Sequence, residues 1–273
     1  MNIFFVSLGC DKNLVDSEVM LGLLDAKGYQ IVDDETQADV MVINTCCFIH
    51  DAKEESIQAI LEMADYKTKG NLKALIVTGC LAQRYKEEIT KEIPEVDAVL
   101  GTNSQATLLD AVDEALKGKV SHVFTPLEGI PQMPGKRMIT TGGFYEYLKI
   151  AEGCNKHCTY CIIPKIRGNY RSVPMETLIE QAKQLAEQGV RELILVAQET
   201  TIYGTDLYGK KSLHLLLKEL CKIPGIIWIR VLYCYPEEIY PELIETIRDE
   251  KKICHYLDLP IQHASDRILK RMG

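Results

Sequence analysis

Short runs of Val, Ile and Leu, separated by segments with helical spacing, constrain the fold more than any other feature of this sequence. In the first half we expect strands at residues 2–8, 39–45, 72–78 and 98–101. We expect a helix at 13–27, a second that follows the strand at 39–45 and ends at about 66, a third at 82–89, and a fourth that follows the strand at 98–101 and ends at about 117. These strands are apolar throughout, which is typical of parallel strands buried on both faces. The first half is therefore predicted to be a doubly wound, parallel-sheet α/β domain.

The second half restarts the same alternation. Strands are expected at residues 147–151, 192–197, 226–233 and 256–260, and helices at 175–188, 213–221, 237–248 and 266–272. Repeated β/α winding of this kind indicates a β/α barrel. Four strand signals are too few to close one, so we expect a partial barrel that is truncated at its C-terminal end and belongs to a longer protein.

A segment rich in Pro and Gly separates the two halves. It contains Pro126, Gly129, Pro131, Pro134, Gly135, Gly142 and Gly143. Such residues interrupt regular structure and mark loops. The predicted organisation is a domain at residues 1–117, a linker at 118–144 and a second domain at 145–273.

Composition narrows the class of protein. The chain has no run of about 18 apolar residues, so no membrane span is expected, and its first residues lack the basic leader of a signal peptide. We therefore expect a cytoplasmic protein, in which ten cysteines favour metal binding or catalysis over disulfides. The net charge is −8, and residues 1–146 carry 13 basic against 23 acidic side chains. This acidic half is a poor surface for nucleic acid and a plausible one for a basic protein.

The loop that follows the first strand of the second half carries three closely spaced cysteines. Cys154, Cys158 and Cys161 have the spacing Cys-x3-Cys-x2-Cys, with Tyr160 before the last of them. Three thiolates can hold three irons of a four-iron cluster and leave the fourth iron open. The loop resembles the signature of radical S-adenosylmethionine (SAM) enzymes, in which the open iron binds SAM. The alternative is a zinc site, with His157 as the fourth ligand.

A second set of cysteines lies in the first half. Cys10, Cys46 and Cys80 each follow a predicted strand. In parallel α/β sheets, sites form at the carboxyl ends of strands, so three thiols far apart in sequence can meet at one edge. The alternative is that each is a small buried apolar residue. The shared placement of all three favours a metal site.

Several further residues are weaker candidates. Gln198 and Gln262 end predicted strands and, with Tyr160, are candidate SAM contacts. His263 also ends a strand, where a role in the site and a role in packing are both open. Five cations are expected around the cysteine loop, as SAM or substrate contacts or as surface charges: Lys149, Lys156, Lys165, Arg167 and Arg171. A packing or loop role is expected for the remaining cysteines, Cys47, Cys221, Cys234 and Cys254.

Taken together, these motifs resemble the methylthiotransferases, a family of radical SAM enzymes. The resemblance spans the chain and rests on SLGCDKNLVDSE (residues 7–18), VINTC (42–46), VTGC (77–80) and EGCNKHCTYCIIPKIRG (152–168). It implies a radical SAM cluster on Cys154, Cys158 and Cys161 and an auxiliary [4Fe-4S] cluster on Cys10, Cys46 and Cys80. It also implies two uses of SAM, as radical source and as methyl donor, and an electron donor such as flavodoxin or ferredoxin.

Within this family the motifs favour a protein substrate. The DKNLVDSE after Cys10 and LDLPIQHASDRILKRMG (residues 257–273) match the branch that modifies the β-carbon of an aspartate in the twelfth protein of the small ribosomal subunit. Two alternatives stay open: the same chemistry on an adenosine of transfer RNA, and a non-catalytic binding module stabilised by zinc. Family members continue past residue 273 with the rest of the barrel and a small β-barrel domain, which is a second reason to expect a truncated sequence.

Overall fold

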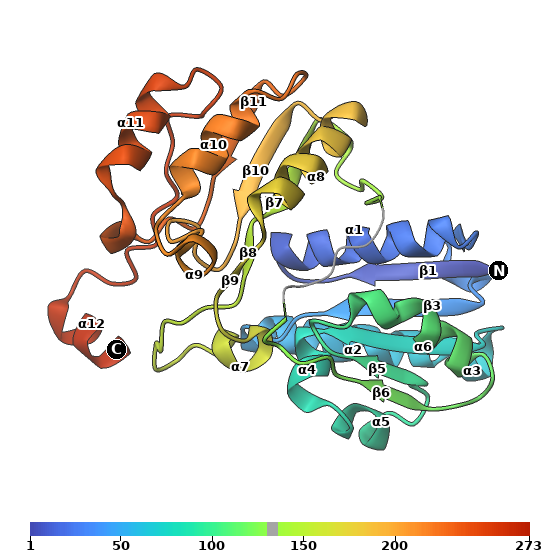
Figure 1. The fold of residues 1–273 in the computed structure, drawn as a ribbon. Helices are drawn as coiled ribbons and strands as arrows, with labels where there is room; N and C mark the ends of the chain where they lie inside the picture. Colours follow the sequence, from blue (N-terminus) through green and yellow to red (C-terminus); the bar gives the residue numbers. More distant parts are fainter. Residues whose placement is uncertain (130–135) are drawn as a thin grey trace. The chain divides into compact units, whose positions relative to one another are not determined.

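The computed structural model describes residues 1–129 and 136–273, and Pro131, Pro134 and Gly135 of the predicted linker lie outside the described residues. The chain forms two compact units. The first comprises Met1–Met138 together with Lys165–Arg167, and the second comprises Ile139–Pro164 and Gly168–Gly273. Figure 1 shows the elements of both units.

The first unit contains a six-stranded parallel sheet in the order β2-β1-β3-β4-β5-β6. Its strands are β1 (Asn2–Ser7), β2 (Gln30–Ile31), β3 (Val40–Thr45), β4 (Ala74–Gly79), β5 (Ala98–Leu100) and β6 (Ser121–Val123). Its helices are α1 (Asp11–Ala26), α2 (His50–Ala64), α3 (Tyr66–Lys69), α4 (Cys80–Tyr85), α5 (Glu88–Glu92) and α6 (Leu108–Ala115), with short 3₁₀ turns at Glu35–Gln37 and Gln105–Thr107. The order reverses beside β1, as in doubly wound folds.

Helices cover both faces of this sheet because the central strands are apolar on both sides. Every residue of β3 and β4 is buried. Alternate residues such as Val42 and Ile76 pack with Met20 and Leu24 of α1 and with α6. The intervening residues point the other way, where α2, α4 and α5 contact β3, β4 and β5. The predicted parallel α/β domain is confirmed.

The structure differs from the sequence prediction at three places in this unit. The strands β2 and β6 were not predicted, and β6 pairs with β5 within the expected linker. The helix expected at 82–89 is divided into α4 and α5 because Lys86 adopts a positive φ of 46°. The domain boundaries at 117 and 145 remain a proposal.

The second unit is built on a three-stranded parallel sheet in the order β11-β10-β7. Its strands are β7 (Tyr145–Lys149), β10 (Glu192–Val196) and β11 (Trp228–Val231), beside an antiparallel pair, β8 (Ala151–Glu152) and β9 (Arg171–Ser172). Its helices are α8 (Met175–Glu187), α9 (Thr205–Tyr208), α10 (Leu213–Cys221), α11 (Pro241–Asp249) and α12 (Asp266–Met272), with a 3₁₀ turn at Pro236–Glu238. The short helix α7 (Ile163–Arg167) ends in the segment that belongs to the first unit.

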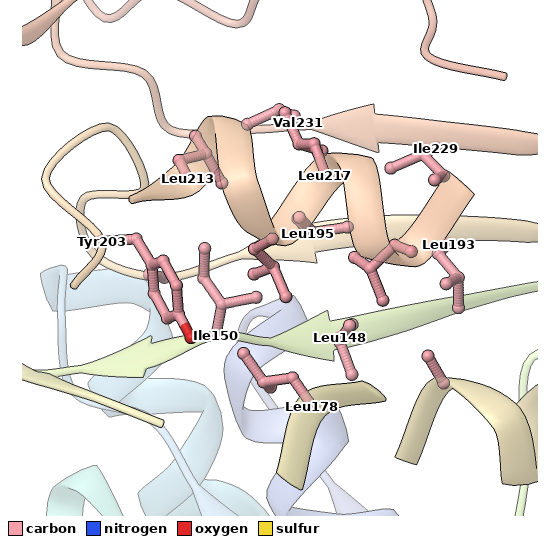
Figure 2. Close-up of a cluster of buried hydrophobic side chains, with 14 of the residues drawn as sticks. Leu148, Ile150, Leu178, Leu193, Leu195, Tyr203, Leu213, Leu217, Ile229 and Val231 are labelled. Atoms are coloured by element: carbon pink, nitrogen blue, oxygen red, sulfur yellow. The ribbon is translucent and has the colours of Figure 1, made fainter. Parts of the chain in front are cut away.

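Apolar side chains from the sheet and its covering helices form one core in the second unit. Figure 2 shows Leu148, Leu193 and Leu195 of the strands packed with Leu178 of α8 and Leu217 of α10, all fully buried. Parallel strands need a crossover connection, and the helices that provide it cover the sheet. The β/α winding expected for a radical SAM domain is therefore present.

The strand expected at residues 256–260 is absent. Just before this range, an isolated bridge between Ile229 and Ile253 connects the chain to the sheet. Further on, Asp258 accepts two hydrogen bonds from the backbone beyond β11: its carboxylate binds the N–H of Tyr233, and its carbonyl binds that of Cys234. A side chain thus takes the place of one ladder bond, so regular pairing does not develop. Among the described residues, no helix is long and apolar enough to cross a membrane.

Candidate metal centres

The first unit brings Cys10, Cys46 and Cys80 to one edge of its sheet. They directly follow Gly9, Thr45 and Gly79, at the carboxyl ends of β1, β3 and β4, which are neighbours in the sheet. Thr45 and Gly79 are partners in the strand register, so Cys46 and Cys80 leave the sheet side by side. Cys46 and Cys80 are each 6% exposed, whereas Cys10 is open to solvent.

Two glycines give this edge its close packing. Gly9 and Gly79 have φ values of 95° and 93°, which L side chains rarely adopt. A Cβ on Gly9 would lie 2.7 Å from the Cβ of Cys46, and one on Gly79 would lie 2.3 Å from Oδ1 of Asn44. The backbone can approach the thiols this closely because no side chain intervenes.

A buried arginine contacts one of these thiols. Arg167 is 2% exposed and pairs with Asp16 at 2.7 Å, donates to Oδ1 of Asn13 and lies 3.4 Å from Sγ of Cys80. Thr102 holds this segment in the first unit by donating a 2.6 Å hydrogen bond to the carbonyl of Ile166. Burial raises the pKa of Cys80 to about 12, and the positive charge of Arg167 acts against that rise. Negative charge on Cys46 and Cys10 would raise this pKa further.

Arg167 has partners that were not predicted. It was expected beside the Cys154–Cys161 loop, and the residue that follows it contacts that loop, since the carbonyl of Gly168 accepts from the N–H of Cys154. The side chain of Arg167 is buried against Asp16 and Cys80, which lie far away in sequence. Lys165, in the same segment, is exposed.

In the second unit, the loop of Cys154, Cys158 and Cys161 follows β8. The N–H of Cys161 donates to the carbonyl of Cys158 at 3.0 Å, which makes a tight turn, and the N–H of Lys156 points at Sγ of Cys154 at 3.4 Å. All three cysteines are partly buried. Burial raises the pKa of Cys154, and the nearby charges of Glu199, Cys161 and Cys158 raise it further. If all three thiols were ionised, a bound cation would offset the repulsion between the thiolates.

The distance between the sulfur atoms of a cysteine set distinguishes a site for one metal ion from a site for a cluster. Sulfur ligands of one tetrahedral zinc, about 2.3 Å from the metal, lie roughly 3.8 Å apart. Within the described ranges, the only three potential ligands whose atoms all lie within 4.8 Å of one another are the exposed His50, Asp51 and Glu54. Neither cysteine set, with or without His157, is that compact. A cluster binds each thiolate through a different iron, so it does not require the three sulfurs to lie as close together as one zinc ion does.

Beside the second loop lies a buried carboxylate that the sequence analysis missed. Glu199 is 2% exposed, and its Oε2 has no hydrogen-bond partner in the described structure, with Nζ of Lys156 4.0 Å away. Oε1 of Gln198, the preceding residue, is likewise unpartnered, while its Nε2 donates to Glu152 at 2.7 Å. Burial is the main cause that raises the pKa of Glu199. Two buried acceptors without hydrogen-bond donors are candidates for contact with a ligand N–H group. Its place at the end of β10, beside Gln198, was the available signal.

The other candidates occupy varied places. Hydroxyl Oη of Tyr160 donates to Oε1 of Gln262 at 2.7 Å, and both residues are exposed. His263 is exposed and its Nδ1 accepts from the N–H of Ser265, so its contact is local.

The remaining cations and cysteines mostly have structural contacts. Lys149 forms a buried pair with Glu152 at 2.8 Å, Arg171 donates to the carbonyl of Asn169, and Lys156 pairs with Glu238 at 2.9 Å. The cysteines expected to pack are buried or half-buried: Cys47, Cys221, Cys234 and Cys254.

Known proteins resemble both halves of the chain. The uncharacterized protein family UPF0004 matches residues 2–101, and the radical SAM superfamily matches residues 148–273. The chain is 66% identical over its whole length to a protein of Lachnoclostridium phytofermentans named ribosomal protein uS12 methylthiotransferase RimO, and 55% identical over 269 residues to one of the same name from Clostridium perfringens. It spans 62% and 60% of the lengths of these relatives.

Solved structures show the same fold. The radical SAM methyltransferase TsrM of Kitasatospora setae, with a tryptophan substrate and a SAM analogue bound, has a TM-score of 0.62 at 12% identity, covering 98% of this chain and 60% of that one. The cobalamin-dependent radical SAM enzyme OxsB has a TM-score of 0.62 at 13% identity, covering 100% of this chain and 45% of that one. A radical SAM domain implies SAM and one [4Fe-4S] cluster. The chain therefore joins a UPF0004 domain to a radical SAM domain, and it is similar over its whole length to proteins named RimO methylthiotransferases.

Proposed function

We propose that this protein is a transferase that replaces a C–H bond by C–S–CH3 at the β-carbon of an aspartate in ribosomal protein uS12. The observation that carries the proposal is the presence of two separate sets of three thiols, one at the edge of the first sheet and one in the loop after β8. The names of the two relatives supply the substrate. Because that substrate is ribosomal, the proposed place of action is the cytoplasm.

Each cysteine set would hold a four-iron cluster through three irons. Cys154, Cys158 and Cys161 would bind the cluster at which SAM is used, and Cys10, Cys46 and Cys80 the auxiliary one. When bound, the first cluster and SAM supply a radical that takes a hydrogen atom from an unactivated C–H bond. The electron would come from a donor such as flavodoxin or ferredoxin.

Residues near the clusters would bind and orient rather than react. Oε2 of Glu199 and Oε1 of Gln198 would accept hydrogen bonds from the ammonium group of SAM, because both oxygens are buried without donors. Tyr160 and Gln262, joined by a hydrogen bond, remain proposed SAM contacts at the exposed side of the loop. Arg167 would hold positive charge beside Cys80, where a thiolate-bound cluster brings negative charge.

Two observations favour this function over the alternatives. The 10 excess acidic side chains of residues 1–146 suit a basic protein better than transfer RNA. Among the described residues, neither cysteine set forms a group as compact as the ligands of one zinc ion, which favours clusters over zinc.

Iron and acid-labile sulfide per chain, after anaerobic reconstitution, test the two-site proposal. We expect about eight irons in the parent protein and about four in a Cys154→Ala/Cys158→Ala/Cys161→Ala variant. Values of about four and none would mean that Cys10, Cys46 and Cys80 bind no cluster. Mass spectrometry of uS12 incubated with the reconstituted protein, SAM and a reductant tests the reaction, and a transfer RNA incubated in parallel tests the alternative substrate.

A further inference from the structure

The first unit has an apolar groove that the cysteine chemistry does not use. It has a volume of about 430 Å³ and lies between α2, α4 and α5. Its floor contains Ile60, Leu81 and Ile89, which are 0%, 2% and 6% exposed. Ile57 and Leu61 of α2 line it as well, yet they are 37% and 47% exposed.

The spacing on α2 explains this arrangement. Ile57, Ile60 and Leu61 are three and four residues apart, so they share one face of the helix. Ile60 packs into the unit, while Ile57 and Leu61 keep much of their surface in water. Large apolar side chains clustered in a groove, rather than scattered singly, mark interaction sites on soluble proteins.

The charge around the groove defines the partner. Residues 50–64 and 86–95, which form α2 and the segment containing α5, carry eight acidic and three basic side chains, and all eight acids are exposed. Glu88 and Glu92 lie in the lining itself. A matching partner has apolar side chains on one face and Lys or Arg beside them. An amphipathic helix laid into a groove is the common way to meet both demands.

We propose that this groove binds a basic amphipathic helical segment of a partner protein. Under the proposed function, on which this identification of the partner rests, the segment belongs to the ribosomal protein substrate. Apolar contacts with Ile57 and Leu61 supply affinity, and the acidic rim speeds association and selects basic partners.

Fluorescence anisotropy with two labelled probes tests the proposal. One is a synthetic 18-residue peptide of Leu and Lys with helical amphipathic spacing, compared with a shuffled peptide of the same composition. The other is purified uS12. The variants are Ile57→Glu/Leu61→Glu, which makes the groove polar, and Glu88→Lys/Glu92→Lys, which reverses its charge.

Matched controls come from the second unit. Leu215 and Ile244 are 37% and 45% exposed, close to the values for Ile57 and Leu61, so Leu215→Glu/Ile244→Glu places the same charges at equally exposed helical sites. Glu176→Lys/Glu187→Lys is the control for charge reversal. Circular dichroism of each variant verifies folding.

We expect each groove variant to weaken binding of both probes at least about tenfold, the effect of one anchor residue, while the controls change it little. Added salt should weaken the affinity that each groove variant retains, because salt screens charge–charge attraction. Binding of the amphipathic peptide without binding of uS12 would support the groove and refute the proposed substrate. Binding of uS12 that is unchanged in the groove variants would support uS12 as the substrate and refute the groove as its docking site. A dimer in solution that Leu61→Glu dissociates would also overturn the proposal, because a second copy would then cover the groove.

Discussion

The substitution Arg167→Met tests the buried network behind Cys80. The side chains of Arg167 and Asp16 are 2% and 6% exposed and pair at 2.7 Å. Removing one member of a buried ion pair typically costs about 3–5 kcal/mol, because the remaining charge stays buried without its partner. Met keeps the apolar stem, so packing changes little. At about 1.4 kcal/mol per factor of ten, opening of the first unit should become about 150- to 5,000-fold more frequent.

Hydrogen exchange followed by mass spectrometry, on the metal-free protein, measures this change region by region. Amides of β3 and β4 should exchange faster by that factor. Amides of β10 and β11, in the second unit, serve as the internal control and should be unaffected. Asp16→Asn in the same background removes the charge that Arg167 no longer neutralises and should restore much of the protection, while Arg167→Lys should give an intermediate result. Unchanged exchange of β3 and β4, or equal acceleration in both units, would refute the reasoning.

Two further predictions concern a glycine and a carboxylate. Gly79→Ala should lower the free energy of unfolding by at least about 2 kcal/mol, since the new Cβ would meet Asn44 at 2.3 Å and the backbone strain of a positive φ adds to the clash. Gly28→Ala is the control, because Gly28 has a similar φ of 90° and a Cβ there would have nothing within 4 Å. This variant should show the backbone strain alone, at about 1 kcal/mol. Equal melting temperatures for the two variants would contradict the clash. Burial raises the pKa of Glu199, so its ionisation in the folded state costs stability as pH rises above the ordinary value of 4.5. Glu199→Gln should therefore be more stable than the parent near pH 7 and equal to it well below pH 4.5. Thermal unfolding of the metal-free proteins measures both stabilities. A stability difference between variant and parent that stays the same across that pH range would argue against a buried, ionising carboxylate.

Local sequence predicted most elements of the fold because its signals are strong and short-range. Continuous apolar runs produced β3 and β4, and helical spacing produced α8 and α10 close to the expected bounds. The misses have physical causes. Residues 121–123 form a strand only because β5 offers them an edge, and residues 256–260 fail to form one because Asp258 binds the backbone beyond β11.

The sequence by itself determined which thiols lie at strand ends and on the loop after β8, since parallel strands place their carboxyl ends at one edge and loop spacing is written in the chain. Only the tertiary structure decided what surrounds those thiols. Arg167 is near Cys161 in sequence but lies against Cys80, because Asp16 pairs with it and Thr102 binds the carbonyl of the preceding residue, Ile166, both from distant segments. Glu199 acquires its significance only from the burial of its Oε2 atom, which no hydrogen-bond donor reaches. Charge pairing and burial depend on contacts between segments far apart in the chain, and such contacts exist only after the chain has folded.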